Sequence, residues 1–352
     1  MKAGVITPGV ADSYRVAEMA EPDAHGRVLF RPDLIGICGT DQEIAAGLYG
    51  EAPPGDSALI LGHEVLGTVL EVGPGSQLRP GDRVVPIVRR PCDHCHPCSL
   101  GQWDQCQSGD YTERGIKGRH GSLSERAAAS ESFLVEVSAE VGDSGVLVEP
   151  GSVVAKALRQ AESAQRRLPW VPHTALVTGA GPIGLLAALL LTQHGYAVTV
   201  MDQVEATSRR ALAVEEVGAT YAQGSQGLAS GGVFDLVIEA TGFSPLVFEA
   251  AAWLAPGGAM VLTGVTGGHR QVVEDTNQFN QRMVLQNQLM VGSVNASRAD
   301  YLHSVAMLQR AAKEHPGWTD ALITRRVEMA DFKSGLAHQP EDIKVVVSVA
   351  SA

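Results

Sequence analysis

The apolar and polar positions of this chain follow two different patterns, and the first covers residues 1 to about 150. There, short apolar runs are separated by glycine and proline, as at Arg27–Phe30, Leu66–Val72, Arg83–Val88 and Phe133–Val137. Runs of this length, bounded by turn residues, predict an irregular antiparallel β domain. The opening residues Met1–Ile6 read as a strand of the same domain.

The second pattern begins near Gly145, where apolar residues take a helical spacing that continues to Leu158. The following stretch, Glu162–His173, is polar and contains proline, and it predicts a connector between two domains. The pattern therefore divides the chain into a β-rich part and a second part in which the spacing of apolar residues is different.

Strands and helices alternate beyond the connector. Strand candidates are Ala175–Thr178, Ala197–Met201, Leu236–Ile238 and Ala259–Leu262, and a helix is expected over Pro245–Leu254. Alternation of apolar strands with helices predicts a doubly wound parallel sheet that is covered on both faces. The fold class is therefore α/β, with a separate β-rich domain.

A glycine-rich turn lies between the first of these strands and the helix that follows it. Gly179, Gly181 and Gly184 have the G-x-G-x-x-G spacing, and Asp202 closes the next strand. The first glycine allows the tight turn, the second lets the backbone approach a pyrophosphate, and the third allows close packing of helix on strand. A carboxylate at 202 accepts hydrogen bonds from ribose hydroxyls and repels a 2′-phosphate, so NAD is preferred to NADP.

Four cysteines crowd into fifteen residues, with the spacing C-x2-C-x2-C-x7-C. A closed set of four thiolates suits tetrahedral Zn²⁺ and leaves no open coordination position, which indicates a structural zinc site. The cysteines are Cys92, Cys95, Cys98 and Cys106.

A second set of metal-ligating residues comes from separate segments of the chain. Cys38 lies early, Gly62-His63-Glu64 follows, and Glu149 comes much later. A thiolate, an imidazole and a carboxylate from different segments form an open zinc site with room for water or substrate. Together these residues predict a catalytic metal centre.

Composition excludes several other functions. The chain has 352 residues, with 27 Lys and Arg against 39 Asp and Glu, and a net charge of −12. This balance argues against nucleic-acid partners and against binding to anionic membranes. The longest apolar run, Ile183–Leu191, is far shorter than the ~20 residues of a membrane helix, and no signal peptide opens the chain, so a cytoplasmic location is expected.

Over nearly its full length the chain resembles the zinc-dependent medium-chain dehydrogenase/reductases, and most closely their glucose dehydrogenase branch. The general signs of the family are Cys38-Gly39-Thr40-Asp41, Gly62-His63-Glu64, Gly81-Asp82-Arg83-Val84, the four-cysteine lobe and Gly179 to Gly184. The signs of the branch are Val85-Pro86-Ile87-Val88-Arg89-Arg90, Glu113-Arg114-Gly115-Ile116, His120-Gly121, Glu149-Pro150 and Val291-Gly292-Ser293-Val294-Asn295.

The resemblance implies two domains with a cleft between them. A GroES-like catalytic domain would span residues 1–155 and 297–352, with the structural zinc lobe at 90–108, and a Rossmann NAD-binding domain would span 156–296. The closing strand Lys344–Val349 would return to the first domain. The resemblance also implies a homodimer or homotetramer.

The resemblance further implies two zinc ions per chain and a role for each site residue. Cys38 and His63 would hold the catalytic zinc with Glu64 and Glu149 close by, and Thr40 would hydrogen-bond the reacting hydroxyl. Glu113 would contact a sugar hydroxyl, and Asn295 would lie near the nicotinamide and the substrate. Cofactor contacts are expected at Gly179, Gly181, Pro182, Ile183, Gly184, Asp202, Thr241 and Asn295.

Four residues depart from the pattern of the relatives. Gln42 and Glu43 stand where many relatives place a histidine of the proton relay. Val153 replaces a polar sugar contact, and Asp300 replaces a histidine. Changed hydrogen-bonding groups change which hydroxyls are satisfied, so a modified sugar, an aminosugar or a cyclitol is expected as substrate, with Asp300 suited to a cationic one.

Three functions are therefore weighed for this chain. The first is a zinc- and NAD-dependent dehydrogenase of a secondary alcohol or hemiacetal carbon of a sugar-like substrate. The second is a sorbitol- or threonine-type dehydrogenase of the same family. Glu113 and Asn295 favour the sugar branch over this alternative. The third is a catalytically silent nucleotide-binding regulator, against which Cys38 and His63 count.

Overall fold

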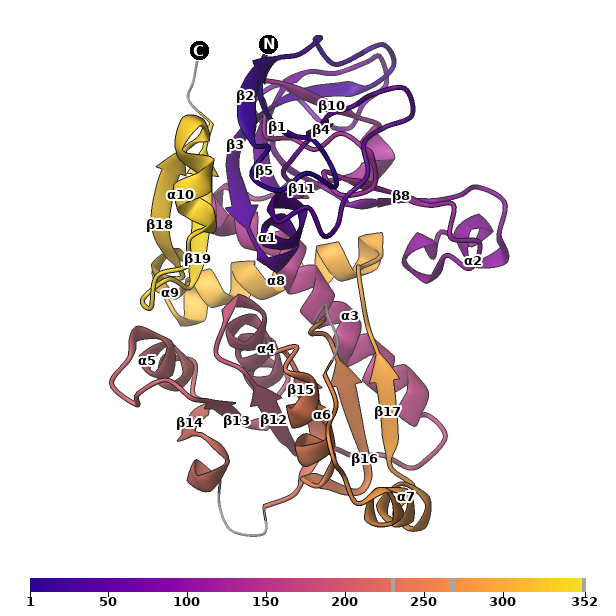
Figure 1. The fold of residues 1–352 in the computed structure, drawn as a ribbon, viewed down its shortest axis with the longest axis vertical. Helices are drawn as coiled ribbons and strands as arrows, with labels where there is room; N and C mark the ends of the chain where they lie inside the picture. The colour runs from indigo at the N-terminus through magenta and orange to yellow at the C-terminus, as the bar shows by residue number, and fades with distance from the viewer. Residues whose placement is uncertain (229–231, 266–269, 350–352) are drawn as a thin grey trace. The chain divides into compact units, whose positions relative to one another are not determined.

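The computed structural model describes residues 1–228, 232–265 and 270–349, and its contacts divide the chain into two compact units (Figure 1). The first unit comprises Met1–Ser152 together with Asn295–Ala352, and the second comprises Val153–Val294. Each unit has its own sheets and its own buried apolar core.

The first unit is built from short strands in three sheets. One sheet has the order β2-β1-β4, a second has the order β11-β6-β5-β3-β19-β18 with β10 paired to β3, and the third has the order β7-β8-β9. The strands are β1 (Lys2–Ile6), β2 (Arg15–Glu18), β3 (Val28–Ile37), β4 (Leu59–Ile60), β5 (Glu64–Glu71), β6 (Arg83–Pro86), β7 (Arg89–Arg90), β8 (Thr112–Arg114), β9 (Gly118–Arg119), β10 (Ala127–Ala129), β11 (Leu134–Val137), β18 (Ile323–Glu328) and β19 (Lys344–Ser348).

Short helices connect these strands, and α8 is the long helix of the C-terminal part. The helices are α1 (Gly39–Ala45), α2 (His96–Ser99), α8 (Arg298–Glu314), α9 (Trp318–Ala321), α10 (Phe332–Leu336) and the 3₁₀ turns η1 (Trp103–Gln105), η2 (Glu131–Phe133), η3 (Ala139–Leu147) and η5 (Met329–Asp331). Helix α3 (Val148–Gln165) begins in the first unit and continues into the second.

The second unit has one parallel sheet of six strands in the order β14-β13-β12-β15-β16-β17, as the alternating pattern predicts. Its strands are β12 (Thr174–Thr178), β13 (Ala197–Asp202), β14 (Thr220–Gln223), β15 (Phe234–Glu239), β16 (Leu254–Leu262) and β17 (Leu289–Gly292). Its helices are α4 (Pro182–Gln193), α5 (Arg209–Glu216), α6 (Ser244–Ala251), α7 (Thr276–Leu285) and the turn η4 (Ser225–Gly227).

The α/β class is confirmed, while two predicted boundaries are wrong. The stretch expected to be a connector from Glu162 is helical as far as Gln165, because α3 continues through it. The helix expected to reach Leu254 ends at Ala251, and Leu254 is the first residue of β16. In both places tertiary packing overrides the local signal: Gln165 is buried and donates to the Gly257 carbonyl, and Leu254 belongs to the core of the sheet.

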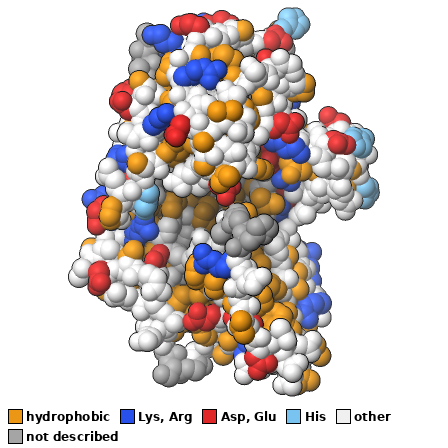
Figure 2. Space-filling view, viewed as in Figure 1, with side chains coloured by type: hydrophobic (Ala, Val, Ile, Leu, Met, Phe, Trp, Pro, Cys, Tyr) orange, Lys and Arg blue, Asp and Glu red, His pale blue; other side chains and the backbone are white. Residues whose placement is uncertain are grey.

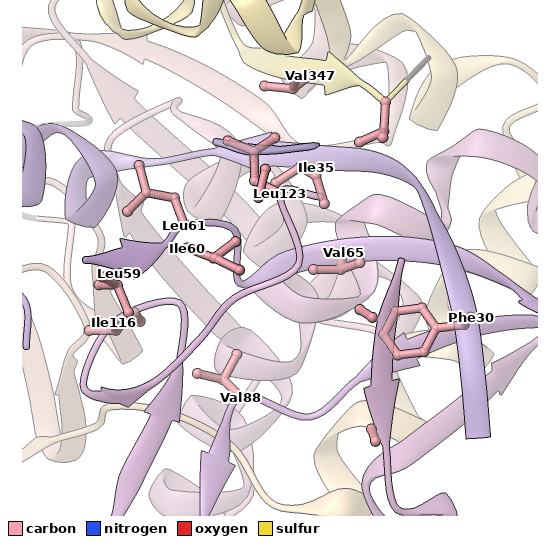
Figure 3. Close-up of a cluster of buried hydrophobic side chains, with 14 of the residues drawn as sticks. Phe30, Ile35, Leu59, Ile60, Leu61, Val65, Val88, Ile116, Leu123 and Val347 are labelled. Carbon is pink, nitrogen blue, oxygen red and sulfur yellow. The ribbon is translucent and has the colours of Figure 1, made fainter. Parts of the chain in front are cut away.

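The closing strand β19 pairs antiparallel with β3, so the end of the chain joins the sheet of the first unit. Val347 of β19 and Ile35 of β3 are register partners, and both are buried. Figure 3 shows them in one apolar cluster with Val65, Leu61 and Phe30. Burial of such side chains stabilises the sheet that carries the metal-ligating residues described below.

Helix α4 is apolar on every side because it is packed inside the second unit. All residues from Gly184 to Leu191 are buried, and the helix begins with Gly181 at the N-cap and Pro182 in its first turn. Proline is favoured there because it lacks the amide hydrogen that a helix start leaves unpaired.

Among the described residues, no helix combines the length and apolar character needed to cross a membrane. The charged residues are mixed in sign, and Figure 2 shows acidic and basic side chains interspersed over the visible face.

Candidate functional site

The sheet of the first unit brings Cys38 and His63 together. Strands β3 and β5 pair antiparallel with Gly36 opposite Glu64, so Cys38 after β3 and His63 before β5 meet at the same end of the pair. Cys38 Sγ lies 3.1 Å from His63 Nε2, and the His63 side chain is buried. A pair of residues 25 positions apart is thus placed in direct contact by strand register.

Asp41 completes this cluster, and the sequence analysis gave it no role of its own. Its Oδ2 accepts a hydrogen bond from the Cys38 amide at 3.0 Å, which holds the start of α1. Its Oδ1 lies 3.7 Å from His63 Nδ1, and the residue is 1% exposed. The Asp41 carboxylate thus lies close to the His63 ring without a hydrogen bond to Nδ1, and its charge stabilises positive charge on that ring. The signal available in the sequence was the position of Asp41 in the Cys-Gly-Thr-Asp motif.

Glu64 is held beside the cluster by a lysine from the far end of the chain. Lys344 Nζ donates to Glu64 Oε2 at 2.5 Å and to the Ile37 carbonyl at 3.2 Å, and both charged side chains are buried. The register partner of Glu64 is Gly36, where an added Cβ would stand 2.0 Å from Glu64 Oε2. Glycine at 36 therefore makes room for the carboxylate, and Lys344 neutralises it.

Burial raises the pKa of three acids in this region. Burial is the main cause for the Cys38 thiol and for the Asp41 carboxyl. Burial and then the charge of Glu64 raise the pKa of Glu149 to about 7. For His63, burial favours the neutral ring, but the Cys38 thiolate and Asp41 outweigh it, so its pKa lies well above the ordinary value. A positive charge near Cys38, Asp41 and Glu149 would favour their ionised forms.

The donor set fits a zinc ion. The side-chain donors of Cys38, Asp41 and His63 all lie within 4.8 Å of one another. Zn–S and Zn–N bonds of about 2.3 and 2.0 Å at a tetrahedral angle require a separation of about 3.5 Å between sulfur and nitrogen. The observed 3.1 Å between Cys38 Sγ and His63 Nε2 differs from it by a few tenths of an ångström. A divalent cation would also favour the ionised forms of these acids, whose pKa values burial raises.

The four cysteines of the lobe also meet. The sulfur atoms of Cys92, Cys95, Cys98 and Cys106 lie within 4.8 Å of one another, and those of Cys95 and Cys106 are 3.9 Å apart. A tetrahedral ZnS₄ centre requires about 3.8 Å between sulfurs, so this set fits zinc as well. The lobe carries α2 and η1 and follows β7. Figure 2 shows histidine side chains on the surface of this lobe.

The glycine-rich turn has the geometry that a dinucleotide requires. Gly179 has a φ of +95°, and a Cβ added at Gly184 would stand 1.8 Å from the Gly179 carbonyl oxygen, so both glycines are needed by the fold itself. A Cβ added at Gly181 would meet no atom within 4 Å. Open space at the N-cap of α4 is where a pyrophosphate would approach the free helix amides, so the turn fits the cofactor.

Asp202 at the end of β13 lies against this turn. Its Oδ2 accepts from the Ala180 amide at 2.5 Å, and its Oδ1 accepts from the Gln203 amide at 2.6 Å. Pro182 and Ile183 form the first turn of α4. Thr241 also lies beside the turn: a Cβ added at Gly179 would stand 3.0 Å from Thr241 Cγ2.

The structure brings Glu113 and Asn295 into contact. Asn295 Nδ2 donates to Glu113 Oε1 at 2.6 Å, and Arg89 Nη2 donates to the same oxygen at 2.9 Å. Glu113 and Arg89 are buried, which strengthens their ion pair. Arg89, which the sequence analysis placed only in a family motif, therefore orients the carboxylate.

The remaining predicted residues lie on two helices. Thr40 is half-buried in α1, close in sequence to Cys38, which precedes the helix as its N-cap. In the same helix Gln42 is exposed and donates to the Leu336 carbonyl, while Glu43 is half-buried. Asp300 is 2% exposed, and its Oδ2 accepts from the Ser297 amide and hydroxyl at 2.8 and 2.7 Å. Asp300 thus caps α8, which gives no support to the expected contact with a cationic substrate.

Models of two protein families match this chain. The model described as "Glucose dehydrogenase C-terminus" matches residues 142–349, and that described as "Alcohol dehydrogenase GroES-like domain" matches residues 24–139. Together they cover most of both units.

Several characterised proteins are similar to the chain over its full length. Glucose 1-dehydrogenase of Thermoproteus tenax is 42% identical, and glucose 1-dehydrogenase 2 of Vulcanisaeta moutnovskia is 39% identical, each with 99% of both chains covered. The crystal structure of Haloferax mediterranei glucose dehydrogenase in complex with NADP, Zn and gluconolactone has a TM-score of 0.89 at 31% identity, and both chains are covered completely.

Proposed function

Since the chain belongs to the zinc-dependent medium-chain dehydrogenase/reductases, in their glucose dehydrogenase branch, we propose that it oxidises the hemiacetal carbon of glucose or a closely related sugar with NAD⁺. The observation that carries the proposal is the contact of Cys38 with the buried His63 ring, with the Asp41 carboxylate 3.7 Å from its other nitrogen. The proposed products are the sugar lactone and NADH.

The catalytic residues of the proposal all belong to the first unit. Cys38 and His63 would hold the zinc ion, the Asp41 carboxylate lies 3.7 Å from His63 Nδ1, and Glu64 and Glu149 lie near as carboxylates. Bound there, zinc supplies a Lewis acid that lowers the pKa of a substrate hydroxyl. Thr40 on α1 would accept the hydroxyl proton and pass it towards solvent.

Substrate recognition is assigned to Glu113 and Asn295. Arg89 fixes one oxygen of Glu113, which leaves the other oxygen to accept from a sugar hydroxyl. A buried carboxylate that is held in place discriminates strongly against analogues that leave it unpaired. Asp300 is not included in this set, because its carboxylate caps α8.

The cofactor is proposed to be bound at the glycine-rich turn of the second unit. The open space at Gly181 would take the pyrophosphate, and Asp202 would accept from the adenosine ribose. The related Haloferax mediterranei enzyme was crystallised with NADP. The preference for NAD in this chain rests on the Asp202 carboxylate, which would repel a 2′-phosphate.

A panel of substrates tests the proposed reaction. Glucose, galactose, glucosamine, sorbitol and myo-inositol are each assayed with NAD⁺ and with NADP⁺, before and after treatment with a zinc chelator. We expect the highest kcat/KM with glucose or galactose and NAD⁺, and loss of that activity on chelation. Turnover of sorbitol alone, or turnover that survives complete removal of zinc, would contradict the proposal.

Substitution of Asp202 tests the cofactor assignment. In Asp202→Asn an oxygen remains for the Ala180 amide, but the charge is removed. We expect the ratio of kcat/KM for NAD⁺ over NADP⁺ to fall by about tenfold or more, since a hydrogen bond to a charged group contributes about 1.5–3 kcal/mol. Glu215→Gln, which removes an exposed carboxylate from α5, is the matched control and should leave the ratio unchanged. An unchanged ratio in Asp202→Asn would show that another residue sets the preference.

A further inference from the structure

A cavity lies in the first unit, apart from the metal cluster. Its volume is about 490 Å³, and residues from three segments line it: 1–27, 53–60 and 114–128. Cys38, His63, Glu64, Glu149, Glu113 and Asn295 are not among its lining residues. Four arginines line the cavity, namely Arg27, Arg114, Arg119 and Arg126. We call this cavity the arginine pocket.

Three of these arginines have no carboxylate partner in the described part of the chain. Arg114 donates to the Ser122 hydroxyl and the Ala128 carbonyl, at 3.1 and 2.8 Å. Arg119 donates to the Thr112 hydroxyl at 3.1 Å, and Arg27 donates to a backbone carbonyl. All these acceptors are neutral, so they orient the guanidinium groups without compensating their charge.

The carboxylates of the arginine pocket are engaged elsewhere. Asp56 lies 3.1 Å from His120 Nε2, and Glu21 lies 3.6 Å from Arg126. Asp23 accepts a hydrogen bond from the His25 amide. In the described part of the chain, none of these acids makes an ion pair with Arg27, Arg114 or Arg119.

Burial makes the charge of Arg114 costly, whereas Arg119 is half-buried and Arg27 is exposed. Arg114 is 5% exposed, and its Nε has no hydrogen-bond partner among the described residues. Burial, followed by the charges of Arg119 and Arg27, lowers the pKa of Arg114 to about 10. Burial and then Arg27 lower the pKa of Arg119. A buried charge without a counterion is a strong destabilising feature, and an anion in the arginine pocket would relieve it.

Strand β8 separates the arginine pocket from the proposed sugar contact. Glu113 and Arg114 are consecutive residues of β8, so their side chains point to opposite faces. Glu113 bonds to Arg89 and Asn295, whereas Arg114 bonds to Ser122 and Ala128. The pocket is thus a distinct site, on the reverse face of the strand that holds the substrate-binding carboxylate.

We propose that the arginine pocket binds the phosphate group of a phosphorylated small molecule, which Arg27 and Arg119 would contact and the buried charge of Arg114 would stabilise. Guanidinium groups match the geometry of phosphate oxygens and form paired, charge-assisted hydrogen bonds with them. The volume of the cavity leaves room for more than the phosphate group itself. This site is independent of the dinucleotide site, which belongs to the second unit.

Calorimetric titration with inorganic phosphate tests the proposal. The zinc-loaded protein is first saturated with NADH, so that phosphate does not occupy the glycine-rich turn, and chloride is kept low because salt screens such sites. We expect one phosphate per chain, and we expect the dissociation constant to rise by about tenfold or more in Arg27→Gln/Arg119→Gln, which loses charge-assisted hydrogen bonds. Arg310→Gln, which removes an exposed arginine paired with Glu314 on α8, is the control and should bind phosphate as the unmodified protein does.

Thermal unfolding gives a second readout, because a ligand that binds only the folded state raises the melting temperature. Phosphate should raise it in the unmodified protein and in Arg310→Gln, but not in the double variant. Absence of both heat and thermal shift in the unmodified protein would overturn the proposal, as would equal phosphate affinity in the double variant. Malonate, a dicarboxylate of similar size, is titrated in parallel, and affinity equal to that for phosphate would overturn the assignment to phosphorylated ligands.

Discussion

Replacing Cys38 by alanine is expected to remove one of two zinc ions per chain and to lower kcat/KM for glucose by about a thousandfold or more. The estimate follows from the several kcal/mol of charge stabilisation that a Lewis-acid metal supplies, since each 1.4 kcal/mol changes a rate about tenfold. His63 and the flanking carboxylates alone would leave zinc with a single nitrogen donor and hard oxygen ligands. The measurements are the zinc content of the purified protein and initial rates with saturating NAD⁺.

A second cysteine variant separates this loss from a general effect of metal removal. Cys106→Ser should also lose one zinc ion per chain, but from the lobe, where four thiolates form a closed set with no position for substrate. We therefore expect a lower thermal unfolding temperature for Cys106→Ser, and a much smaller loss of activity in the protein that remains folded. Two zinc ions and full activity in Cys38→Ala would contradict the assignment of Cys38 as a catalytic ligand.

Two of these sites could be predicted from local spacing, because their residues lie close together in the chain, whereas the catalytic set was predicted from residue types in separate segments. The glycine-rich turn with its helix, and the four cysteines of the lobe, each use one short segment with a fixed spacing. Their geometry follows from local backbone requirements, such as the positive φ of Gly179 and the close approach at Gly184. For these two sites, residue type and spacing in the sequence are therefore enough to predict the site.

The parts that could not be predicted depend on register and on distant segments. Lys344 and Glu64 are 280 residues apart in the chain, and they meet only because β19 pairs with β3. Arg89 reaches Glu113 because β7 pairs with β8. Asp300 was expected to face a substrate, yet it caps α8, because a carboxylate at the third position of a helix can bond back to the N-cap residue. Sequence spacing contains no information on which of these partners will meet.

Replacing Lys344 by methionine is expected to lower the free energy of unfolding by about 3–5 kcal/mol, which is the usual cost of removing one partner of a buried ion pair. Lys344 is 2% exposed and Glu64 is 3% exposed, so the carboxylate would be left in the interior without a counterion. Burial alone would lower the pKa of Lys344, but the charges of Glu64 and Cys38 outweigh it and raise that pKa, so the ammonium form is the one that is lost. Urea unfolding of the zinc-loaded protein measures the change.

The double variant Lys344→Met/Glu64→Gln shows whether Lys344→Met is unstable because Glu64 is left as a buried charge without a counterion or because packing is lost. If the single variant is unstable because Glu64 keeps its charge, then neutralising Glu64 should restore most of the stability, whereas a packing defect would remain in both variants. Lys333→Met on α10 is the matched control, since its ammonium group is half exposed and 4.0 Å from Asp12, and exposed pairs contribute about 1 kcal/mol or less. Two results would show that the buried pair does not hold this end of β5 in place. One is a loss of unfolding free energy in Lys344→Met no larger than in the control, and the other is a double variant as unstable as the single one.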